Sequence, residues 1–215
     1  MKLTLYCFPG ACSRATMISL EETGAAYSTH VPNMMKNEQK SPEYLAVNPK
    51  GKVPVLVVDG EPLTENIAIL GFLADSFPDS GLLPPITDAF RRAQAFSAVA
   101  WLSSSLLPAY GRVFRPANIC DVEGTEDRIK ALATQEILAG LTLADKHLDG
   151  RDWWVGQWSI ADAYLYYIEC AANRINADIK DFPNLARHIA RMEERPSVQR
   201  VLQWEKEMMA KLTAT

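Results

Sequence analysis

Four residues within one short stretch of this sequence have the chemistry to bind a small peptide. Pro54 stands at the start of an apolar run, and an X-Pro bond in such a place is a candidate for the cis form. A cis Val53–Pro54 bond would turn the N–H and carbonyl groups of Val53 outward, where they could pair with an extended peptide. Glu65 and Asn66 follow at the start of a predicted helix, an end that favours anions. A carboxylate beside an amide at that position can hold an ammonium and a carboxylate group together.

The elements that must position these residues are indicated by the same stretch. Residues 55–58 are β-branched and apolar, which is typical of a strand, and Asp59-Gly60 favours a tight hairpin turn. Leu63 closes a short partner strand, and Thr64 is predicted to be the N-cap of the helix. A hairpin and an acidic helix start are each common by themselves. Their combination, in the order strand, hairpin, strand and helix, is more specific and indicates a binding site.

This combination resembles that of a known family. The run Pro-Lys-Gly-Lys-Val-Pro-Val-Leu at 49–56, followed by Leu-Thr-Glu-Asn-Ile-Ala-Ile at 63–69, is similar to the glutathione-binding half of the cytosolic glutathione transferases, whose N-terminal domain is thioredoxin-like. The resemblance implies that glutathione is the co-substrate. It also implies that the residue before a cis proline pairs with the cysteinyl backbone of glutathione, and that the helix start holds the γ-glutamyl end. In this chain, Val53 precedes Pro54 and would pair with the cysteinyl backbone. Glu65 and Asn66 would hold the γ-glutamyl end.

The resemblance raises the question of which residue activates the thiol. Glutathione chemistry needs a thiolate at neutral pH, whereas a free thiol has a pKa of about 8.5, which a helix N-terminus with a nearby donor can lower. The order Pro-Gly-Ala-Cys-Ser at 9–13 is most similar to the bacterial beta class, in which the cysteine lies beside the glutathione sulfur and can form a mixed disulfide. Cys12 is therefore the first candidate, although most free cysteines are small buried apolar residues. Ser13 is the second candidate, because theta-like relatives use a serine at this end of the helix. Tyr6 is expected to be a packing residue rather than a catalytic one.

Other residues are implied by the same class. Lys36 corresponds to a lysine that points at the glycine carboxylate of glutathione; a solvated surface lysine is the alternative, and Lys50 could share the role. The class also carries an asparagine and a histidine on the first long helix of the second domain. This chain has Ser103 at the first position and Tyr110, or Leu107 in a shifted register, at the second. We therefore expect no histidine base and an apolar, aromatic electrophile site lined by Tyr110, Arg112, Phe114 and Arg115, with helix surface as the alternative for the two arginines.

The chain as a whole predicts two domains. Residues 1–80 give the order βαβαββα, which is one crossover unit followed by a hairpin and a covering helix. A turn-rich, proline-rich linker at 81–87 leads to an all-helical domain over 88–215. The predicted fold class is thus a thioredoxin-like α/β domain followed by an all-α helical bundle.

Helices in the second domain are predicted from caps and periodicity. One covers 88–107, where Pro108 is expected to kink or end it, and another covers 126–148 with apolar residues at helical spacing. Ser159 and Asp162 form a capping box ahead of a helix that is apolar on all sides. That segment resembles the folding box of the same family, which implies a structural role. Shorter helices are expected at 185–194 and 197–211.

Composition excludes several classes of function. The chain has 215 residues, a net charge of −4 and 48% hydrophobic residues, which suits a globular protein and gives no support to nucleic-acid binding. No apolar run reaches the ~18 residues that cross a membrane, and the first residues do not form a signal peptide. The four cysteines show neither a Cys-x-x-Cys pair nor a zinc spacing. We therefore expect no metal site and a reduced, cytoplasmic setting.

The function predicted from these residues is a glutathione transferase that conjugates the glutathione thiolate to small hydrophobic electrophiles, with a peroxide as an alternative acceptor. The resemblance also implies a homodimer and a role in detoxification. Two alternatives stay open. One is thiol-disulfide exchange with glutathione through Cys12 alone; the other is a binding protein that has kept the fold and lost turnover.

Overall fold

The computed structural model describes residues 1–175 and 177–214. Its first half follows the predicted order βαβαββα, with two short 3-10 helices after the second strand. The elements are β1 (Leu3–Tyr6), α1 (Ser13–Thr23), β2 (Tyr27–His30), η1 (Met34–Lys36), η2 (Glu38–Lys40), α2 (Pro42–Val47), β3 (Val55–Val58), β4 (Glu61–Thr64) and α3 (Asn66–Ser76). The predicted fold class, a thioredoxin-like α/β half followed by helices, is confirmed.

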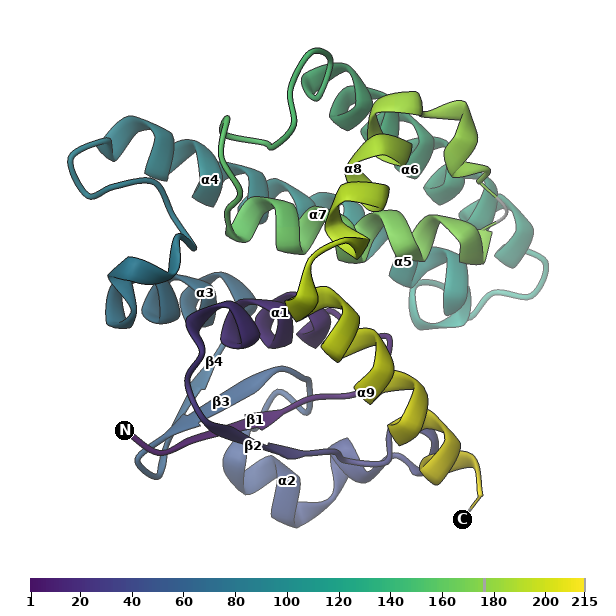
Figure 1. Cartoon of the computed structure of the whole chain (residues 1–215). Helices are drawn as coiled ribbons and strands as arrows, with labels where there is room; N and C mark the ends of the chain where they lie inside the picture. Colours follow the sequence, from purple (N-terminus) through teal and green to yellow (C-terminus); the bar gives the residue numbers. More distant parts are fainter. Residues whose placement is uncertain (176, 215) are drawn as a thin grey trace.

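One mixed sheet organises this half. The strand order is β2-β1-β3-β4; β1 runs parallel to β2 and antiparallel to β3, and β3 runs antiparallel to β4. Leu3 and Leu5, two positions apart on β1, are both buried, as the alternation of side chains along a strand requires. Figure 1 shows α1 and α3 on the face of the sheet that meets the second half of the chain, and α2 on the opposite face.

The start of α3 differs from the prediction. The assignment of Thr64 as N-cap is wrong, because Thr64 is the last residue of β4, where it pairs with Val55. Its hydroxyl accepts a hydrogen bond from Lys50 Nζ at 2.7 Å. The residue before the helix is Glu65, which has φ 73° and makes no side-chain cap. The hairpin pairing extends one residue further than the apolar pattern indicated, and this moves the helix start to Asn66.

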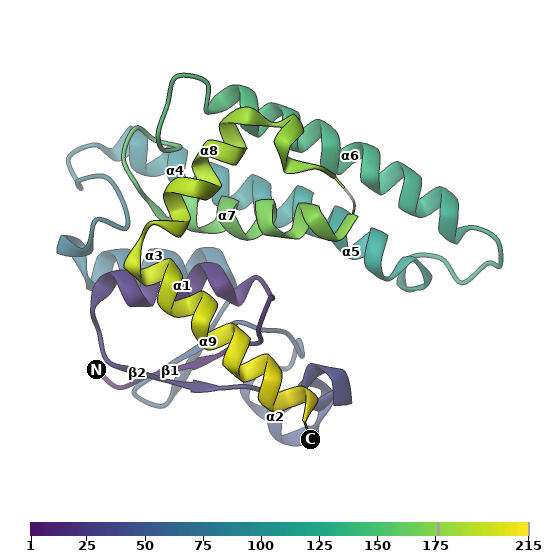
Figure 2. The same cartoon turned by 45° about the vertical axis from the view of Figure 1, so that its right-hand side comes forward.

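In the second half, the described residues form helices joined by turns and irregular chain, with no strand among them. Its long elements are α4 (Ala89–Trp101), a π-helical segment η4 (Leu102–Leu106), α5 (Leu107–Phe114), α6 (Glu126–His147), α7 (Ile160–Ala172), α8 (Pro183–Glu193) and α9 (Pro196–Thr213). The central helix α7 packs against α1, α4 and α8. Figure 2 shows that α9 leaves this bundle and runs back along the first half, where it packs against α1. None of the described helices has the length and apolar character that crossing a membrane requires.

The helix over 89–114 does not end at Pro108. The α-helical pattern is instead interrupted just before it by the π-helical segment Leu102–Leu106, in which the N–H of Leu107 donates to the carbonyl of Leu102. Pro108 lacks an N–H and would clash with a carbonyl one turn earlier in a regular α-helix. The wider π turn shifts the hydrogen-bond pattern ahead of the proline, so the chain stays helical through Phe114.

The predicted capping box at the start of α7 is confirmed. The N–H of Ser159 donates to Asp162 Oδ2 at 2.9 Å, and the Ser159 hydroxyl accepts from the N–H of Ala161. Asp162 Oδ1 also accepts the N–H of Trp154 at 2.8 Å, which joins the preceding loop to the helix. Ser159, Ala161 and Asp162 lie in the core and Trp154 is half-buried, so the otherwise unpaired N–H groups of this helix start are satisfied internally.

A buried charge cluster lies beside this cap. His188 Nδ1 is 2.9 Å from Glu169 Oε2, and His188 Nε2 is 3.4 Å from Asp162 Oδ1 without hydrogen-bond geometry. Burial by itself would lower the pKa of His188, but the facing Glu169 and Asp162 carboxylates outweigh it and raise the pKa to about 10. Burial raises the pKa of Glu169. The cluster therefore holds an imidazolium between two carboxyl groups inside the bundle.

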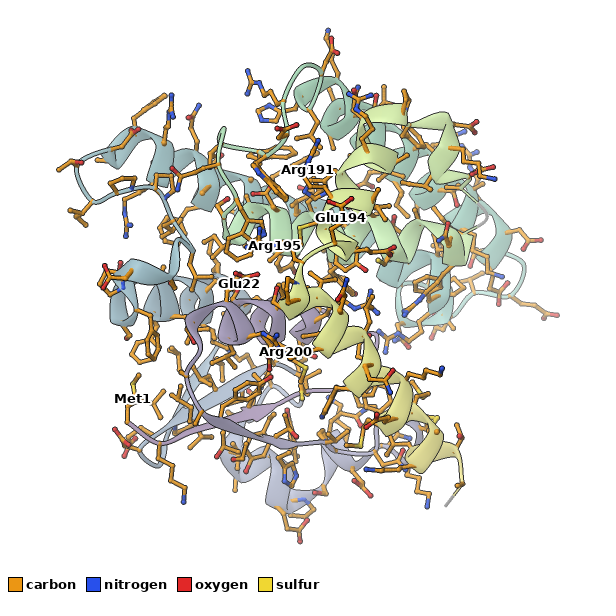
Figure 3. The ribbon with its side chains drawn as sticks, in the orientation of Figure 1. Met1, Glu22, Arg191, Glu194, Arg195 and Arg200 are labelled. Atoms are coloured by element: carbon orange, nitrogen blue, oxygen red, sulfur yellow. The ribbon has the colours of Figure 1, made fainter. Side chains whose placement is uncertain are left out.

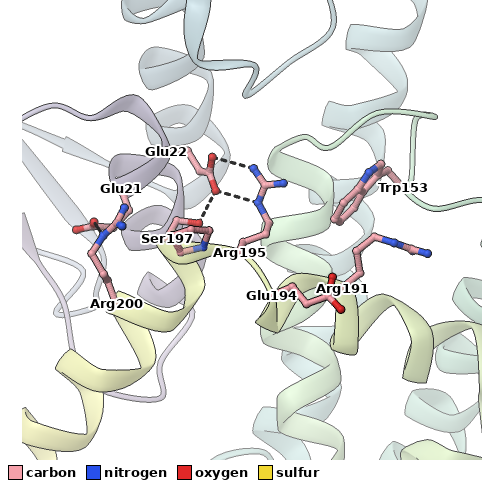
Figure 4. Close-up of a pocket in the computed structure, with 9 residues that line it drawn as sticks. Glu21, Glu22, Trp153, Arg191, Glu194, Arg195, Ser197 and Arg200 are labelled. Carbon is pink, nitrogen blue, oxygen red and sulfur yellow. Dashed lines mark hydrogen bonds and ion pairs between the residues drawn. The ribbon is translucent and has the colours of Figure 1, made fainter.

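The two halves are joined by ion pairs between α1 and the α8–α9 corner. Glu22 pairs with Arg195 at 2.8 Å, Glu21 with Arg200 at 2.5 Å, and the Ser197 hydroxyl bonds Glu22. Figure 3 shows Glu22 and Arg195 where the halves meet, and Figure 4 shows the crevice of about 480 Å³ around them. Because its central charges already neutralise one another, we interpret this crevice as a clamp between the halves rather than as a ligand site.

Replacing His188 by glutamine is expected to lower the free energy of unfolding by about 3 kcal/mol, because the change leaves Glu169 buried without a cationic partner. The raised pKa of His188 stabilises the fold fully below pH 6.5 and loses this effect as the pH rises through about 10. Urea denaturation between these pH values should therefore show a decline in wild type that the His188→Gln variant lacks. The double variant His188→Gln/Glu169→Gln serves as control and should regain part of the loss. An identical pH dependence in wild type and His188→Gln would contradict this assignment.

Candidate functional site

The loop before α1 places Cys12 at the helix N-terminus. Cys12 is the N-cap residue of α1 and makes no side-chain cap. Its Sγ donates instead to the carbonyl oxygen of Val53 at 3.6 Å, across 41 positions of sequence. The Val53–Pro54 peptide bond is cis, as the sequence suggested. The cysteine and the residue before the cis proline, both singled out from the sequence, therefore face each other.

The thiol of Cys12 is not acidic in this setting. Burial raises its pKa, and the nearby Glu65 carboxylate adds to the rise. The backbone N–H of Cys12, the Asn66 amide and the Lys52 ammonium lower the pKa, but the result is still about 11. The protein without glutathione thus keeps Cys12 protonated at neutral pH, although the residue stands at a helix N-terminus.

Ser13 is used by the loop itself. Its side chain is 1% exposed, and its hydroxyl accepts from the N–H of Phe8 at 3.2 Å and lies 3.3 Å from the Phe8 carbonyl oxygen, to which it can donate. A hydroxyl closed onto the preceding backbone in this way stabilises the turn into α1. These contacts favour a structural role for Ser13 and leave Cys12 as the more accessible group at this end of the helix.

The loop that carries Val53 is held from three sides. The carbonyl of Lys52 accepts from the Tyr44 hydroxyl at 2.8 Å and from Asn48 Nδ2 at 2.7 Å. Gly51 has φ 61°, and a Cβ there would lie 2.8 Å from the carbonyl oxygen of Gln39, so only glycine fits. The main-chain groups of this loop are therefore fixed in place before any ligand arrives.

Asn66 connects the two helix starts at the site. Its side chain is buried; Oδ1 accepts from the Thr16 hydroxyl at 2.6 Å, and Nδ2 donates to the Cys12 carbonyl at 3.2 Å. Glu65 is more open, with its side chain 65% exposed and paired with Lys50 at 2.5 Å. The side chain of Asn66 is thus committed to the fold, whereas the Glu65 carboxylate faces solvent and can exchange its partner.

Lys36 lies apart from these contacts. It ends the 3-10 helix η1, which Asn33 caps through its side-chain oxygen, and it is exposed. Its main-chain N–H donates to Asn33, but no hydrogen bond or ion pair of the Lys36 side chain is found within the described ranges. Lys52, by contrast, acts on the Cys12 thiol and was not singled out from the sequence, because a lysine in a loop carries no distinguishing signal.

The predicted electrophile site needs correction. Tyr110 does not line a cleft, because it is 2% exposed and its hydroxyl donates to the Ile168 carbonyl at 3.2 Å inside the bundle. Arg112 pairs with Glu136, and the Ser103 hydroxyl donates to the carbonyl of Ala100. The π-helical segment shifts the phase of this helix, so the spacing that assumed a regular α-helix placed Tyr110 on the wrong face.

Two tyrosines of α7, Tyr164 and Tyr167, lie near Cys12, and the sequence analysis did not predict them as site residues. Burial raises the pKa values of Tyr164 and Tyr167, and the proximity of Cys12 raises them further, so both phenols stay protonated and can donate. Tyr167 also lies within electrostatic range of Arg174 and Arg115. The prediction described this helix only as apolar on all sides. The tyrosines at 164, 166 and 167 are the signal in its sequence that could have marked it.

The cysteine loop is also tied to the last helix. Glu205 on α9 accepts the N–H of Gly10 at 3.0 Å and forms an ion pair of 2.5 Å with Arg14, both side chains being 10% exposed. From the other side, Arg174 Nη2 donates to the Gly10 carbonyl at 3.2 Å. The loop next to Cys12 is therefore set by residues 164 and 195 positions away from Gly10, which no local pattern could indicate.

Comparisons with known proteins agree with this geometry. Residues 1–75 match the family description "Glutathione S-transferase, N-terminal domain", and residues 118–205 match "Glutathione S-transferase, C-terminal domain". The chain belongs to the glutathione S-transferase family. Within that family, Glutathione S-transferase GstA of Escherichia coli O157:H7 is 34% identical over 209 residues, which cover 94% of this chain and 98% of GstA.

Solved glutathione S-transferases place the chain near the bacterial beta class. The beta-class enzyme of Sphingomonas chungbukensis is 34% identical with a TM-score of 0.82, covering 94% of this chain and 98% of that one. A sphingomonad glutathione S-transferase complexed with glutathione is 35% identical with a TM-score of 0.83 and the same coverage. The resemblance to this class stated from the sequence is thereby confirmed.

Alkylation is expected to distinguish Cys12 from Cys120. Hydrogen bonds from the Val122 backbone and the Thr125 side chain lower the pKa of Cys120, whereas that of Cys12 is about 11. Because the thiolate is the nucleophile, iodoacetamide at pH 7.5 should modify Cys120 first, at a rate at least about tenfold higher. Peptide mass spectrometry over time measures both rates. In the Cys120→Ala variant, the labelling of Cys12 is followed without the reaction at Cys120. Faster labelling of Cys12 in protein free of glutathione would show that its thiol is acidic.

Proposed function

We propose that this glutathione S-transferase conjugates the glutathione thiolate to small hydrophobic electrophiles. Residues 1–80 bind glutathione, residues 88–215 bind the acceptor, and 81–87 join them. The observation that carries the proposal is the convergence of Cys12, Val53 and Asn66, which are in direct contact across up to 54 positions. These are the positions at which the family resemblance puts the thiol and the tripeptide backbone.

The proposed contacts with glutathione follow from the hydrogen-bonding groups of the site residues that can still bind a ligand. The main-chain groups of Val53, beside Pro54, pair with the cysteinyl unit. Because both polar atoms of the Asn66 side chain already have partners within the fold, its main-chain N–H in the first turn of α3 is proposed to bind the γ-glutamyl carboxylate. Glu65 binds the ammonium group in place of Lys50. Lys36 is proposed to attract the glycine carboxylate. The sphingomonad relative complexed with glutathione supports binding of this tripeptide.

Cys12 is assigned as a hydrogen-bond donor to the glutathione sulfur. Lowering the pKa of a thiol by about two units requires about 2.7 kcal/mol of preferential stabilisation of the thiolate. A hydrogen bond to a charged acceptor contributes about 1.5–3 kcal/mol, and the N-terminus of α1 adds a smaller amount. With its pKa near 11, Cys12 keeps the proton needed for this role. Ser13 supports the loop.

The same protonation argues against the disulfide-exchange alternative. An attacking thiolate at position 12 would need a pKa near ambient pH, whereas burial holds the pKa of Cys12 at about 11.

The acceptor, an electrophilic carbon or a peroxide, is proposed to lie against Tyr167, with Arg115 and Arg174 nearby. The thiolate attacks the carbon, a bond to sulfur forms, and the leaving group departs with the electron pair of the broken bond.

Conjugation of glutathione to chlorodinitrobenzene tests these roles. Cys12→Ala is expected to lower kcat and kcat/KM together by about 10- to 100-fold, because the lost hydrogen bond forms mainly with the thiolate. Glu65→Gln is expected to raise the KM for glutathione about tenfold with little change in kcat, because that contact binds substrate and transition state equally. Steady-state kinetics measure both.

Cys120→Ala is the matched control and should retain wild-type kinetics. Full turnover in both Cys12→Ala and Ser13→Ala would remove these residues from the mechanism. A wild-type protein that reduces glutathione mixed disulfides through Cys12 and gives negligible conjugation would instead support the exchange reaction.

We further propose that the enzyme acts as a cytoplasmic homodimer in detoxification. Ile86, three residues before α4, and Phe90, in its first turn, are 77% and 74% exposed. Two large apolar side chains so close together in the sequence favour burial against a second copy. Sedimentation velocity is expected to show a dimer for wild type and a shift toward monomer for Phe90→Ser. Val122→Ser, another exposed apolar position, is the control. A monomeric wild type at micromolar concentration would refute the dimer.

A further inference from the structure

One side of α7 leads from the core of the helical half to the loop beside Cys12. Tyr164, Tyr167 and Arg174 follow one another at spacings of three and seven residues, which place side chains on the same side of a helix. The chain stays helical beyond α7, because η6 (Asn173–Ile175) continues it. The two tyrosines are buried and their rings meet edge to face at 6.1 Å, whereas Arg174 is exposed. This side of the helix therefore ends in a guanidinium group at the surface.

The Arg174 guanidinium lies against the cysteine loop. Its Nη2 donates to the carbonyl of Gly10, two positions before Cys12, at 3.2 Å. A Cβ at Gly10, which has φ 72°, would lie only 2.6 Å from the same nitrogen, so the contact requires a residue without a side chain. Glu205, which accepts the Gly10 N–H, is paired with Arg14, and no ion pair of Arg174 is found within the described residues. Because a guanidinium has five N–H donors, most of those of Arg174 can still bind a ligand.

A second arginine approaches from the end of α5. Arg115 follows the last residue of that helix, and its backbone N–H donates to the Gly111 carbonyl at 3.0 Å. Its side chain is exposed, and no ion pair of it is found in the part of the chain that the structure describes. Burial and the proximity of Cys12 raise the pKa of Tyr167, and the charges of Arg174 and Arg115 oppose this rise. Both arginines and the thiol therefore lie within electrostatic range of one phenol.

The protein does not neutralise this pair of arginines with its own carboxylates. Glu65, on the glutathione side of the cysteine, is paired with Lys50. Apolar surface adjoins the pair, because Phe114 is 43% exposed and stacks on Tyr110 with the ring centroids 6.2 Å apart. A chain of net charge −4 thus places uncompensated positive charge, next to aromatic rings, on the side of Cys12 that the acceptor must approach.

We propose that the electrophile is a carboxylic acid, whose carboxylate binds Arg115 and Arg174 while its reactive carbon lies beside the glutathione sulfur. This inference rests on the proposed function and narrows its substrate class from neutral apolar compounds to anionic ones. A guanidinium group matches the planar carboxylate with charge-assisted hydrogen bonds. With an aryl chloride, the sulfur–carbon bond forms and chloride departs with the electron pair of the broken bond. The carboxylate itself is unchanged.

Two electrophiles that share one reactive carbon test the proposal. 4-Chloro-3-nitrobenzoate carries the negative charge, and its methyl ester lacks it. For each compound, kcat/KM is divided by the rate constant of the uncatalysed reaction with glutathione, which corrects for intrinsic reactivity. The acid-to-ester ratio of these accelerations is expected to be at least about tenfold in wild type.

Substitution of each arginine is expected to reduce this ratio. Arg115→Gln and Arg174→Gln should each lower it about tenfold, mainly by raising the KM for the acid, because the contact binds substrate and transition state alike. Arg174→Lys should retain part of the ratio, since lysine keeps the charge but loses the planar fork. An unchanged ratio in both glutamine variants would overturn the proposal, because a purely structural role lowers the rates with acid and ester together.

Arg151→Gln is the matched control, because it removes one exposed positive charge from the chain that follows α6 and should retain the wild-type ratio. An equal reduction by Arg151→Gln would attribute the effect to net charge and contradict the assignment. A raised KM for glutathione, measured with the ester in the arginine variants, would assign the pair to glutathione instead. Wild type that accelerates acid and ester equally would overturn this inference alone. No conjugation of either compound or of chlorodinitrobenzene would overturn the transferase proposal and this inference with it.

Discussion

The site depends on one buried amide. Asn66 uses its oxygen for the Thr16 hydroxyl and its nitrogen for the Cys12 carbonyl, so its orientation is fixed and the N-termini of α1 and α3 are held at one separation. A buried polar group that loses its partner costs about 1–3 kcal/mol, which makes this geometry stiff. The groups that face a tripeptide are therefore set by a residue that does not itself present a free side-chain atom to it.

The helical half completes what the sheet half begins. Glu205 accepts a hydrogen bond from the loop that leads into α1 beside Cys12. At the other end of α1, Glu22 forms an ion pair with Arg195. The charges are largely shielded from water, so each pair is strong only as long as both members are present. The cysteine loop thus belongs structurally to both halves, and a disturbance of α9 is transmitted to it without passing through the sheet.

Local patterns predicted the strands, the cis bond before Pro54 and the cap at Ser159, because each depends on residues within a few positions of one another. They failed where the outcome depends on the pairing between strands or on the exact helical phase, which the pattern of residue types does not give. Thr64 is held in β4 by pairing with Val55, and Tyr110 is turned inward by a change of helical phase. The raised pKa of Cys12 is a property of burial. Family resemblance gave the candidate residues, but not which of their atoms are already in use.

The π-helical segment has a consequence for how such an enzyme can change. A π turn accommodates one residue more than the α-helical turn it replaces, and each residue rotates a helix by about 100°. Because the wider turn absorbs the extra residue, losing a single residue from Leu102–Leu106 would restore a regular helix and leave the side chains beyond it on the faces they now occupy. A one-residue loss within this turn would thus keep Tyr110 in the core, whereas the same loss from the α-helical part of α4 would turn it to another face. Sequence alignments across this segment will accordingly tend to slip by one position.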